Sequence, residues 1–164
     1  MRRIGIAFVF ALLCTAPLAS ARETIAIAPN SIAGIKLGMS RVQARALLAK
    51  PVRADRLENG YDRLVSARQK VEVYFRAGAT GVVVVTTWNR ALQTAGYVGP
   101  CSTVAALKAA YGTRLQPFRQ GGKAIAYRLG NLVFTAEGGK RVGVVALGRG
   151  TAATFVALNA PECR

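Results

Sequence analysis

One pattern occurs twice in this chain, and that repetition constrains the fold more than any other feature. In each copy a capping residue precedes a short helix, and strand-like runs follow; the capping residues, Ser40 and Thr103, lie 63 residues apart. A single helix on three or four strands buries only a thin core. We therefore expect an α+β fold of two pseudo-repeats side by side, each a short helix packed on a three- to four-stranded antiparallel sheet.

The first repeat is expected to span residues 22–88, beginning with a short lead-in strand or an extended arm. Its helix should run from the Ser40 cap to about Ala49, because the Ser hydroxyl accepts an amide hydrogen bond and Pro51 stops the helix. The polar stretch 53–60 predicts turns. Alternation of apolar and polar residues predicts three strands, Tyr61–Ser66, Val71–Arg76 and Gly81–Trp88. Val82–Val85 is apolar on both faces, which predicts a central, covered strand.

A linker over residues 89–100 separates this unit from the second repeat, residues 101–164. Thr103 caps a helix whose apolar stripe ends at Tyr111, and Gly112 terminates it. Strand-like runs follow at Ala124–Leu129, Leu132–Ala136, Val142–Leu147 and Thr154–Leu158.

The N-terminus has the three parts of a secretory signal peptide, residues 1–21. Arg2 and Arg3 supply positive charge, Ile4–Leu13 is apolar, and Ala19–Ala21 provides the small residues that a signal peptidase accepts. We expect cleavage near Ala21 and a secreted or periplasmic protein.

A retained membrane anchor is the alternative interpretation of this segment. The apolar stretch is interrupted by Pro17 and is shorter than the roughly 20 residues that span a bilayer. Leu13 stands where a lipoprotein signal has a small residue before Cys14, so no lipid anchor is expected.

Cleavage leaves two cysteines, Cys101 and Cys163. An even number in an oxidising compartment predicts one disulfide, which would close a loop of about 60 residues and stabilise the fold by about 4 kcal/mol. A reactive thiol at Cys101, just before a helix, is the alternative, but no histidine is present to serve as its base.

The complete absence of histidine removes the commonest hydrolytic nucleophile systems and His-ligated metal sites. The acidic cluster Asp55, Glu58 and Asp62 could supply two catalytic carboxylates. Arginines at positions 53, 56 and 63 lie among these acids and would lower their pKa values, so an ion-pair loop is the preferred interpretation. We predict no enzymatic activity, no cofactor and no metal.

We therefore expect the protein to function by binding another molecule. The net charge of +16, or +14 after removal of the leader, would attract anionic cell-envelope polymers, although the basic residues are scattered and indicate no specific nucleic-acid binding. Large amphipathic rings anchor protein interfaces. These considerations select the candidate interaction residues Trp88, Tyr97, Tyr74, Arg41 and Arg45.

Short motifs carry a resemblance to a known family. Residues 34–40, Gly-Ile-Lys-Leu-Gly-Met-Ser, the helix ending 47–51, Leu-Leu-Ala-Lys-Pro, and the strand pair Tyr74-Phe75 resemble the SmpA/OmlA unit. Ala49 stands where the family usually has Gly, and Pro100-Cys101 replaces Gly-Met in the second copy. The tandem arrangement is similar to β-lactamase inhibitor protein, whose two units join their sheets into a concave surface that grips another protein.

The resemblance implies the fold. The repeat, together with the missing catalytic groups, predicts a non-catalytic protein-binding module, inhibitor-like or envelope-assembly-like, whose partner is another exported protein. The exposed sheet face and the segment Trp88–Gly99 would form the contact surface. A binder of anionic envelope polymers is the alternative function.

Overall fold

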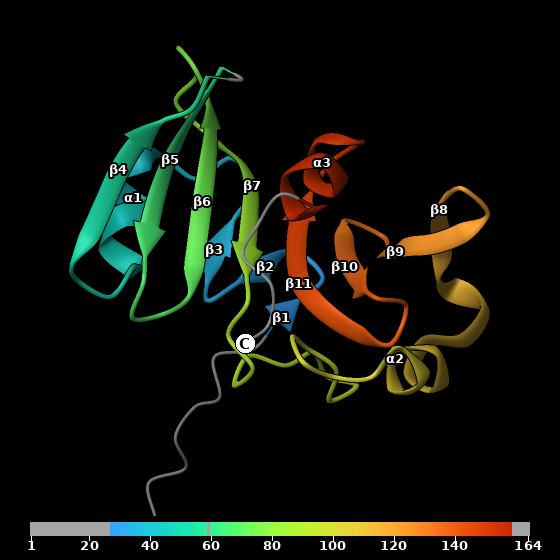
Figure 1. Cartoon of the computed structure of the whole chain (residues 1–164). Coiled ribbons are helices and arrows are strands. Elements are labelled where there is room, and N and C mark those ends of the chain that lie inside the picture. The colour runs from blue at the N-terminus through green and yellow to red at the C-terminus, as the bar shows by residue number, and fades with distance from the viewer. Residues whose placement is uncertain (1–26, 59, 159–164) are drawn as a thin grey trace, which may run out of the picture.

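An eight-stranded antiparallel sheet runs through the whole of the protein (Figure 1). The computed structural model describes residues 27–58 and 60–158, so the predicted signal peptide and Cys163 lie outside the described residues. Strand order across the sheet is β4-β5-β6-β7-β11-β10-β9-β8, with every neighbouring pair antiparallel. The α+β class with antiparallel strands and short helices is confirmed.

The chain reaches this sheet through a small three-stranded sheet. Its strands are β1 Ile27–Ala28, β2 Ser31–Ile32 and β3 Ile35–Lys36. Helix α1 follows, Arg41–Leu47, with Ser40 as its cap: the Ser40 hydroxyl accepts from the amide of Gln43, and the Gln43 side chain accepts from the amide of Ser40. Four strands complete this half, β4 Val52–Arg56, β5 Tyr61–Ser66, β6 Val71–Arg76 and β7 Val82–Thr87.

The second half begins after a loop with helix α2, Val104–Tyr111, capped by the Thr103 hydroxyl. A single turn of 3₁₀ helix, Gly112–Arg114, ends it. The remaining elements are β8 Gln116–Gln120, β9 Lys123–Leu129, β10 Leu132–Glu137, β11 Arg141–Gly148 and α3 Ala152–Leu158.

Two strands were not expected from the sequence. Residues 52–56 form β4 rather than turns, because Asp55 and Arg56 pair across the ladder with the oppositely charged Arg63 and Asp62 of β5. Strand β8 has all five residues exposed and contains Pro117, which an edge strand tolerates because one side of its backbone needs no partner. Both are polar edge strands of the large sheet, so hydrophobic alternation does not reveal them.

The prediction of a strand over residues 154–158 is wrong, because this segment belongs to helix α3. Tertiary packing overrides its β-branched residues. Gly148 and Ala146 of β11 lie beneath the helix, and a Cβ atom built on Gly148 would come within 2.8 Å of the Ala153 Cβ. A close approach of this kind suits a helix of small residues, and α3 packs chiefly on β11, β10 and β7.

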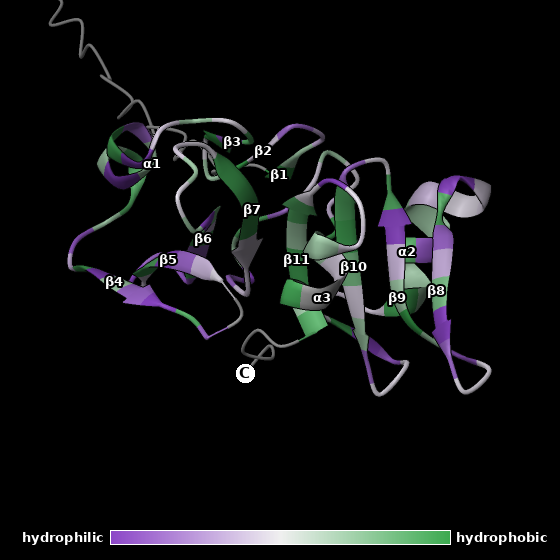
Figure 2. Cartoon of the chain, turned by 90° about the horizontal axis from the view of Figure 1, so that it is seen from above, coloured by the Kyte–Doolittle hydropathy of each residue, from purple (hydrophilic) through white to green (hydrophobic). Residues whose placement is uncertain are grey.

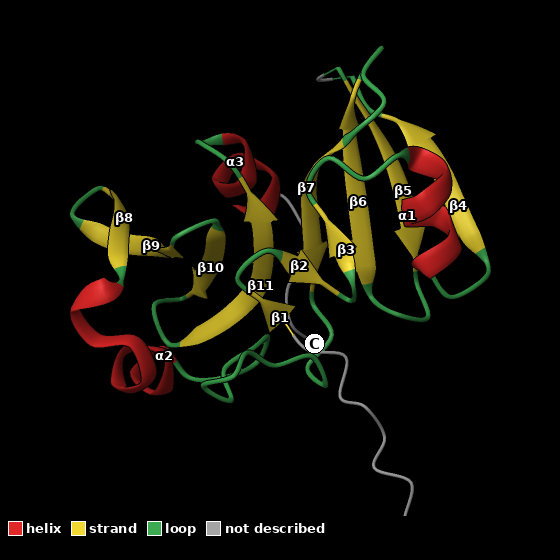
Figure 3. Cartoon of the chain, turned by 180° about the vertical axis from the view of Figure 1, so that it is seen from behind, coloured by secondary structure: helices red, strands yellow, loops and turns green. Residues whose placement is uncertain are grey.

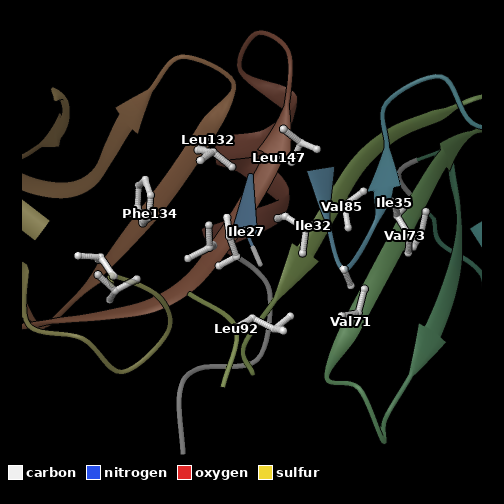
Figure 4. Packing of buried hydrophobic residues seen from close by; sticks show 14 of the residues in the cluster. Ile27, Ile32, Ile35, Val71, Val73, Val85, Leu92, Leu132, Phe134 and Leu147 are labelled. Carbon is white, nitrogen blue, oxygen red and sulfur yellow. The ribbon is translucent and has the colours of Figure 1, made fainter. Parts of the chain in front are cut away.

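Both faces of the sheet centre are covered (Figures 2 and 3). On one face, apolar side chains from the large sheet pack with those of α1, α2 and the small sheet. Figure 4 shows part of this cluster, including Ile27, Ile32, Ile35 and Phe134. On the other face, α3 covers a smaller cluster built around Val84, Val133 and Val144. Strand β7 lies centrally, as the run Val82–Val85 predicted.

The residues before each helix are hydrogen bonded to the last strand of the same half. The amide of Gly38 donates to the Val82 carbonyl and the amide of Val82 to the Met39 carbonyl, both at 2.8 Å. In the second half the amide of Cys101 donates to the Val142 carbonyl at 2.7 Å, and the amide of Val142 to the Ser102 carbonyl at 2.8 Å. Each helix is thereby fixed at the start of its fourth strand.

Candidate interaction surface

The segment between β7 and α2 presents the most exposed aromatic side chain among the described residues. Residues 88–103 contain no helix or strand and form the loop drawn from green to yellow in Figure 1. Tyr97 in this loop is 82% exposed. Its φ of 57° lies in the left-handed region, where a non-glycine residue costs about 1 kcal/mol. The loop therefore holds Tyr97 in an unfavourable backbone conformation while leaving its ring in solvent.

Hydrogen bonds join this loop to α2 and link its own residues. The Tyr111 hydroxyl donates to the Thr94 Oγ1 at 2.6 Å, and the Thr94 Oγ1 also accepts from the Val98 amide at 3.3 Å. The Tyr97 amide donates to the Thr94 carbonyl at 2.9 Å. Leu92 and Val98 of the same loop are buried in the main core cluster. Tyr97 is consequently presented by a rigid support, which lowers the entropy cost of binding.

The N-terminal segment ties the same loop to the body of the protein. The Ile27 amide donates to the Gln93 carbonyl at 2.9 Å, and Ile27 forms a parallel bridge with Thr94. Gly99 lies so close to the Leu92 carbonyl that an added Cβ would stand 2.1 Å from its oxygen. Only glycine fits at this position.

The other two predicted aromatic residues do not join Tyr97. Trp88 is partly buried and packs against the cluster beneath α3. Tyr74 is 4% exposed on β6 and belongs to that same cluster, so its side chain is not available to a partner. The sequence selected Tyr74 by type, but α3 and the neighbouring strands cover the sheet face to which it points.

The two predicted arginines lie on α1, on the opposite side of the sheet from α3. Arg41 binds Asp62 at 2.6 Å, and its guanidinium lies 4.8 Å from the centre of the Phe75 ring. Arg45 is exposed. The five selected residues thus do not form one surface, and Arg41 is engaged within the molecule.

Asp55 and Asp62 of the acidic cluster form two separate ion-pair groups on opposite faces of the β4–β5 ladder. Asp55 accepts from Arg63 at 2.8 Å and pairs with Arg53 at 3.0 Å; Asp62 pairs with Arg56 at 3.0 Å as well as with Arg41. The hydrogen bond from Arg63 lowers the pKa of Asp55, and those from Arg56 and Arg41 lower the pKa of Asp62. These carboxylates therefore remain ionised well into acid.

The ion pair between Asp55 and Arg63 continues to a buried carboxylate on β6. Glu72 is 3% exposed and pairs with Arg63 at 3.2 Å, while the Tyr74 hydroxyl donates a short hydrogen bond to the other carboxylate oxygen. Burial and the adjacent Glu72 raise the pKa of Tyr74 above its usual range. These bonds link β4, β5 and β6 on the face of the sheet that α3 covers. They pair acidic and basic residues that lie close together in the sequence.

Hollows surround the first turn of α3. The largest, about 690 Å³, lies between the β6–β7 turn and the segment leading into α3, with Arg76, Gly81 and Arg149 in its lining. A second of about 510 Å³ is lined by Tyr61, Arg76 and Phe118 together with residues of α3. A third of about 280 Å³ lies beside β8 and is lined by Phe118 and Arg128.

Shared lining residues join these three hollows into one path. Tyr61, Arg76 and Ala152 line both the first and the second, and Phe118 and Thr151 line both the second and the third. We call this path, from the β6–β7 turn past the start of α3 to β8, the α3 groove. No sequence signal predicts this groove, because the sequence predicts a strand over residues 154–158, where α3 forms one wall of it.

Among residues 27–58 and 60–158, no group of three or more His, Cys, Asp or Glu residues could hold a metal ion. No helix within the same described ranges is long and apolar enough to cross a membrane. The expected partner of Cys101 lies beyond the described residues, so that disulfide stays a prediction. Neither a protein-family model, nor a curated protein, nor a solved structure matches the chain.

Proposed function

We propose that the chain is an exported, non-catalytic protein-binding module built from two pseudo-repeats of the SmpA/OmlA kind, with the loop around Tyr97 as its principal contact. The partner is another exported protein. The proposal joins three features, which are the duplicated architecture, the chemistry of the acidic cluster and the presentation of Tyr97.

The hydrogen bonds that precede the helices support the duplication. Gly38 and Cys101 are 63 residues apart, as are the two helix caps, and each donates its amide to the first part of its fourth strand. Both residues have positive φ, 83° and 70°. In each half a capped helix precedes four antiparallel strands, and the two fourth strands, β7 and β11, pair with one another.

The carboxylates support a non-catalytic role. A general acid in hydrolysis needs a raised pKa, whereas hydrogen bonds from arginine side chains lower the pKa of Asp55 and of Asp62. The two side chains are bound by arginines within the sheet, and the chain contains no histidine to act in their place.

One observation carries the binding role: a tyrosine ring 82% exposed on a left-handed residue of a loop whose Leu92, Thr94 and Val98 are buried and whose backbone is hydrogen bonded. Strained backbone conformations persist where the surrounding structure holds them, and they concentrate at binding sites. Tyrosine gives a large contact area at low entropy cost and is enriched among the residues that dominate binding energies.

The test is affinity capture from an envelope extract of the producing cells, with the mature chain as bait. Proteins specific to the proposed site should be retained by the wild type and lost with Tyr97→Ala. Val42→Ala is the matched control, because Val42 is 80% exposed but lies on α1. If both variants capture the same proteins as the wild type, the proposed contact is wrong. If no protein exceeds background at any salt concentration, the function itself is wrong.

The alternative, binding to anionic envelope polymers, is favoured by the charge of the second half. Residues 101–158 contain eight lysines and arginines and one acidic residue, Glu137. Binding driven by that charge would fall steeply with added salt, whereas binding centred on Tyr97 would fall much less. Salt dependence of the captured ligand therefore separates the two functions.

A further inference from the structure

We propose that the α3 groove binds an extended, acidic segment of the partner protein, one that alternates carboxylate and apolar side chains. The inference rests on the proposed protein-binding function and adds a second contact, distinct from Tyr97. It is drawn from the charges, the aromatic rings and the apolar surface that line the groove.

Positive charge without a counterion lines the groove. Arg76 and Arg149 are exposed, and the guanidinium group of neither makes a hydrogen bond or an ion pair with any described residue. Arg128, farther along, donates to the Gly150 carbonyl and keeps its charge at the β8 end. Among the described residues, no aspartate or glutamate lines any of the three hollows of the groove.

The nearby carboxylates do not neutralise these arginines. Asp62, next to Tyr61 on β5, points to the opposite face of the sheet, where it binds Arg41. Glu72 shares the face of Arg76 but is buried and occupied by Arg63 and Tyr74. Glu137 lines a further hollow, which meets the groove at Leu158, at the opposite end of α3 from Arg149. Anionic groups from a ligand would therefore meet a positive surface around Arg76 and Arg149, where no described aspartate or glutamate competes for these side chains.

Apolar and aromatic groups alternate with this charge and decide the class of ligand. Tyr61 lies directly opposite Arg76 on neighbouring strands, and Phe118 is 47% exposed at the other end of the path. Val82 and Leu37 line the first hollow, and Leu158, 43% exposed, lines the second. A polypeptide supplies apolar side chains for this surface together with carboxylates for the arginines. A charged polymer with an anion on every unit would leave the apolar surface unused.

The direct test uses two fluorescent 12-residue peptides and the purified mature protein. One peptide alternates Glu with Leu and Phe, and the other has Gln at every Glu position. We expect the Glu peptide to bind at least about tenfold more tightly at 50 mM salt, from the attraction of a few charges. Equal affinity for the two peptides would overturn the inference.

Matched charge reversals locate the binding. Arg76→Glu and Arg149→Glu should each weaken binding of the Glu peptide by about tenfold. Arg45→Glu and Arg68→Glu change the net charge by the same amount at exposed positions outside the groove and should weaken it by less than about threefold. If all four variants lost affinity equally, the peptide would be attracted by the overall charge alone, and the proposal would be wrong.

Two further arms separate this inference from the proposed function. If dextran sulfate binds to the wild type and to Arg76→Glu equally and displaces the Glu peptide, the groove is not a peptide site. If a partner captured through Tyr97 is retained by the double variant Arg76→Glu, Arg149→Glu, the groove inference fails while the proposed function stands. Both proposals are supported if the double variant loses that partner and the wild type binds the Glu peptide.

Discussion

The phenol of Tyr111, the last residue of α2, donates to the hydroxyl of Thr94 at 2.6 Å and so connects the second helix to the loop that carries Tyr97. Thr94 is 6% exposed, and its Oγ1 also accepts from the Val98 amide. One buried hydroxyl therefore joins the helix to both sides of the exposed tyrosine.

Replacing Tyr111 with Phe removes this bond and leaves the Thr94 hydroxyl without its strongest partner. We expect the free energy of unfolding to fall by about 1 kcal/mol, the usual net value of such a bond. Urea denaturation followed by far-UV circular dichroism measures the change. Tyr97→Phe is the control, because its hydroxyl makes no hydrogen bond with a described residue and the ring is exposed. Equal stability of wild type and Tyr111→Phe would show that the bond does not hold the loop.

The close packing of α3 on β11 leads to a second prediction. In Gly148→Ala the new methyl group would lie 2.8 Å from the Ala153 Cβ and 3.1 Å from a Val84 methyl, so we expect a loss of about 2 kcal/mol. Ala153→Gly alone should cost about 1 kcal/mol through its lower helix propensity. In the double variant the clash with residue 153 is absent, so the two losses should sum to more than the measured total.

Gly143→Ala is the matched control for that cycle. Its added methyl would meet the Thr135 hydroxyl at 3.1 Å rather than the helix. Combined with Ala153→Gly it should show additive losses. Additive losses for Gly148→Ala as well would mean that α3 does not pack on Gly148.

These contacts also show where sequence reasoning succeeds and where it fails. The caps Ser40 and Thr103 are local, since a hydroxyl and an amide three residues away decide them, and both were predictable. The central position of Val82–Val85 was predictable because only a strand covered on both faces can be apolar throughout.

Elements defined by distant partners were not predictable. Ion pairs with β5 stabilise strand β4, and the small residues of β11 allow α3 to pack closely on that strand. Neither interaction can be predicted from the residues of β4 or α3 alone. The burial of Tyr74 follows from the same helix. Consequently the loop of Tyr97 could be proposed as a contact from the sequence, whereas the α3 groove could not.

The ion pairs of Asp55 and Asp62 predict an acid-sensitive contribution to stability. Their pKa values in the folded protein lie below the ordinary value of 3.8. The unfolded state therefore binds protons first as the pH falls, so this stabilisation is full above pH 3.8 and is lost as the pH drops through the lower folded values. Urea unfolding at intervals from pH 5 to pH 2.5 should show a decline in the free energy of unfolding.

Asp62→Asn removes one of the two titrating groups and should make that decline shallower. Glu58→Gln is the control, since Glu58 is exposed and makes no ion pair with a described residue. Its profile should parallel that of the wild type. Parallel profiles for Asp62→Asn and the wild type would contradict a role for the Arg56 and Arg41 pairs in folding.

The predicted disulfide between Cys101 and Cys163 has a direct chemical test. Cys101 lies where the chain enters α2, and its amide is held by the Val142 carbonyl, so a bond from this point to the C-terminus would tether the end of the chain to β11 and α2. Mass spectrometry of an unreduced digest should find the two cysteine peptides linked, and Cys101→Ser should lower the free energy of unfolding by about 4 kcal/mol under oxidising conditions. Reduction with dithiothreitol should lower the stability of the wild type to that of the variant and leave the variant unchanged. Two titratable thiols per mature chain after air oxidation would refute the bridge and return Cys101 to the alternative of a reactive thiol.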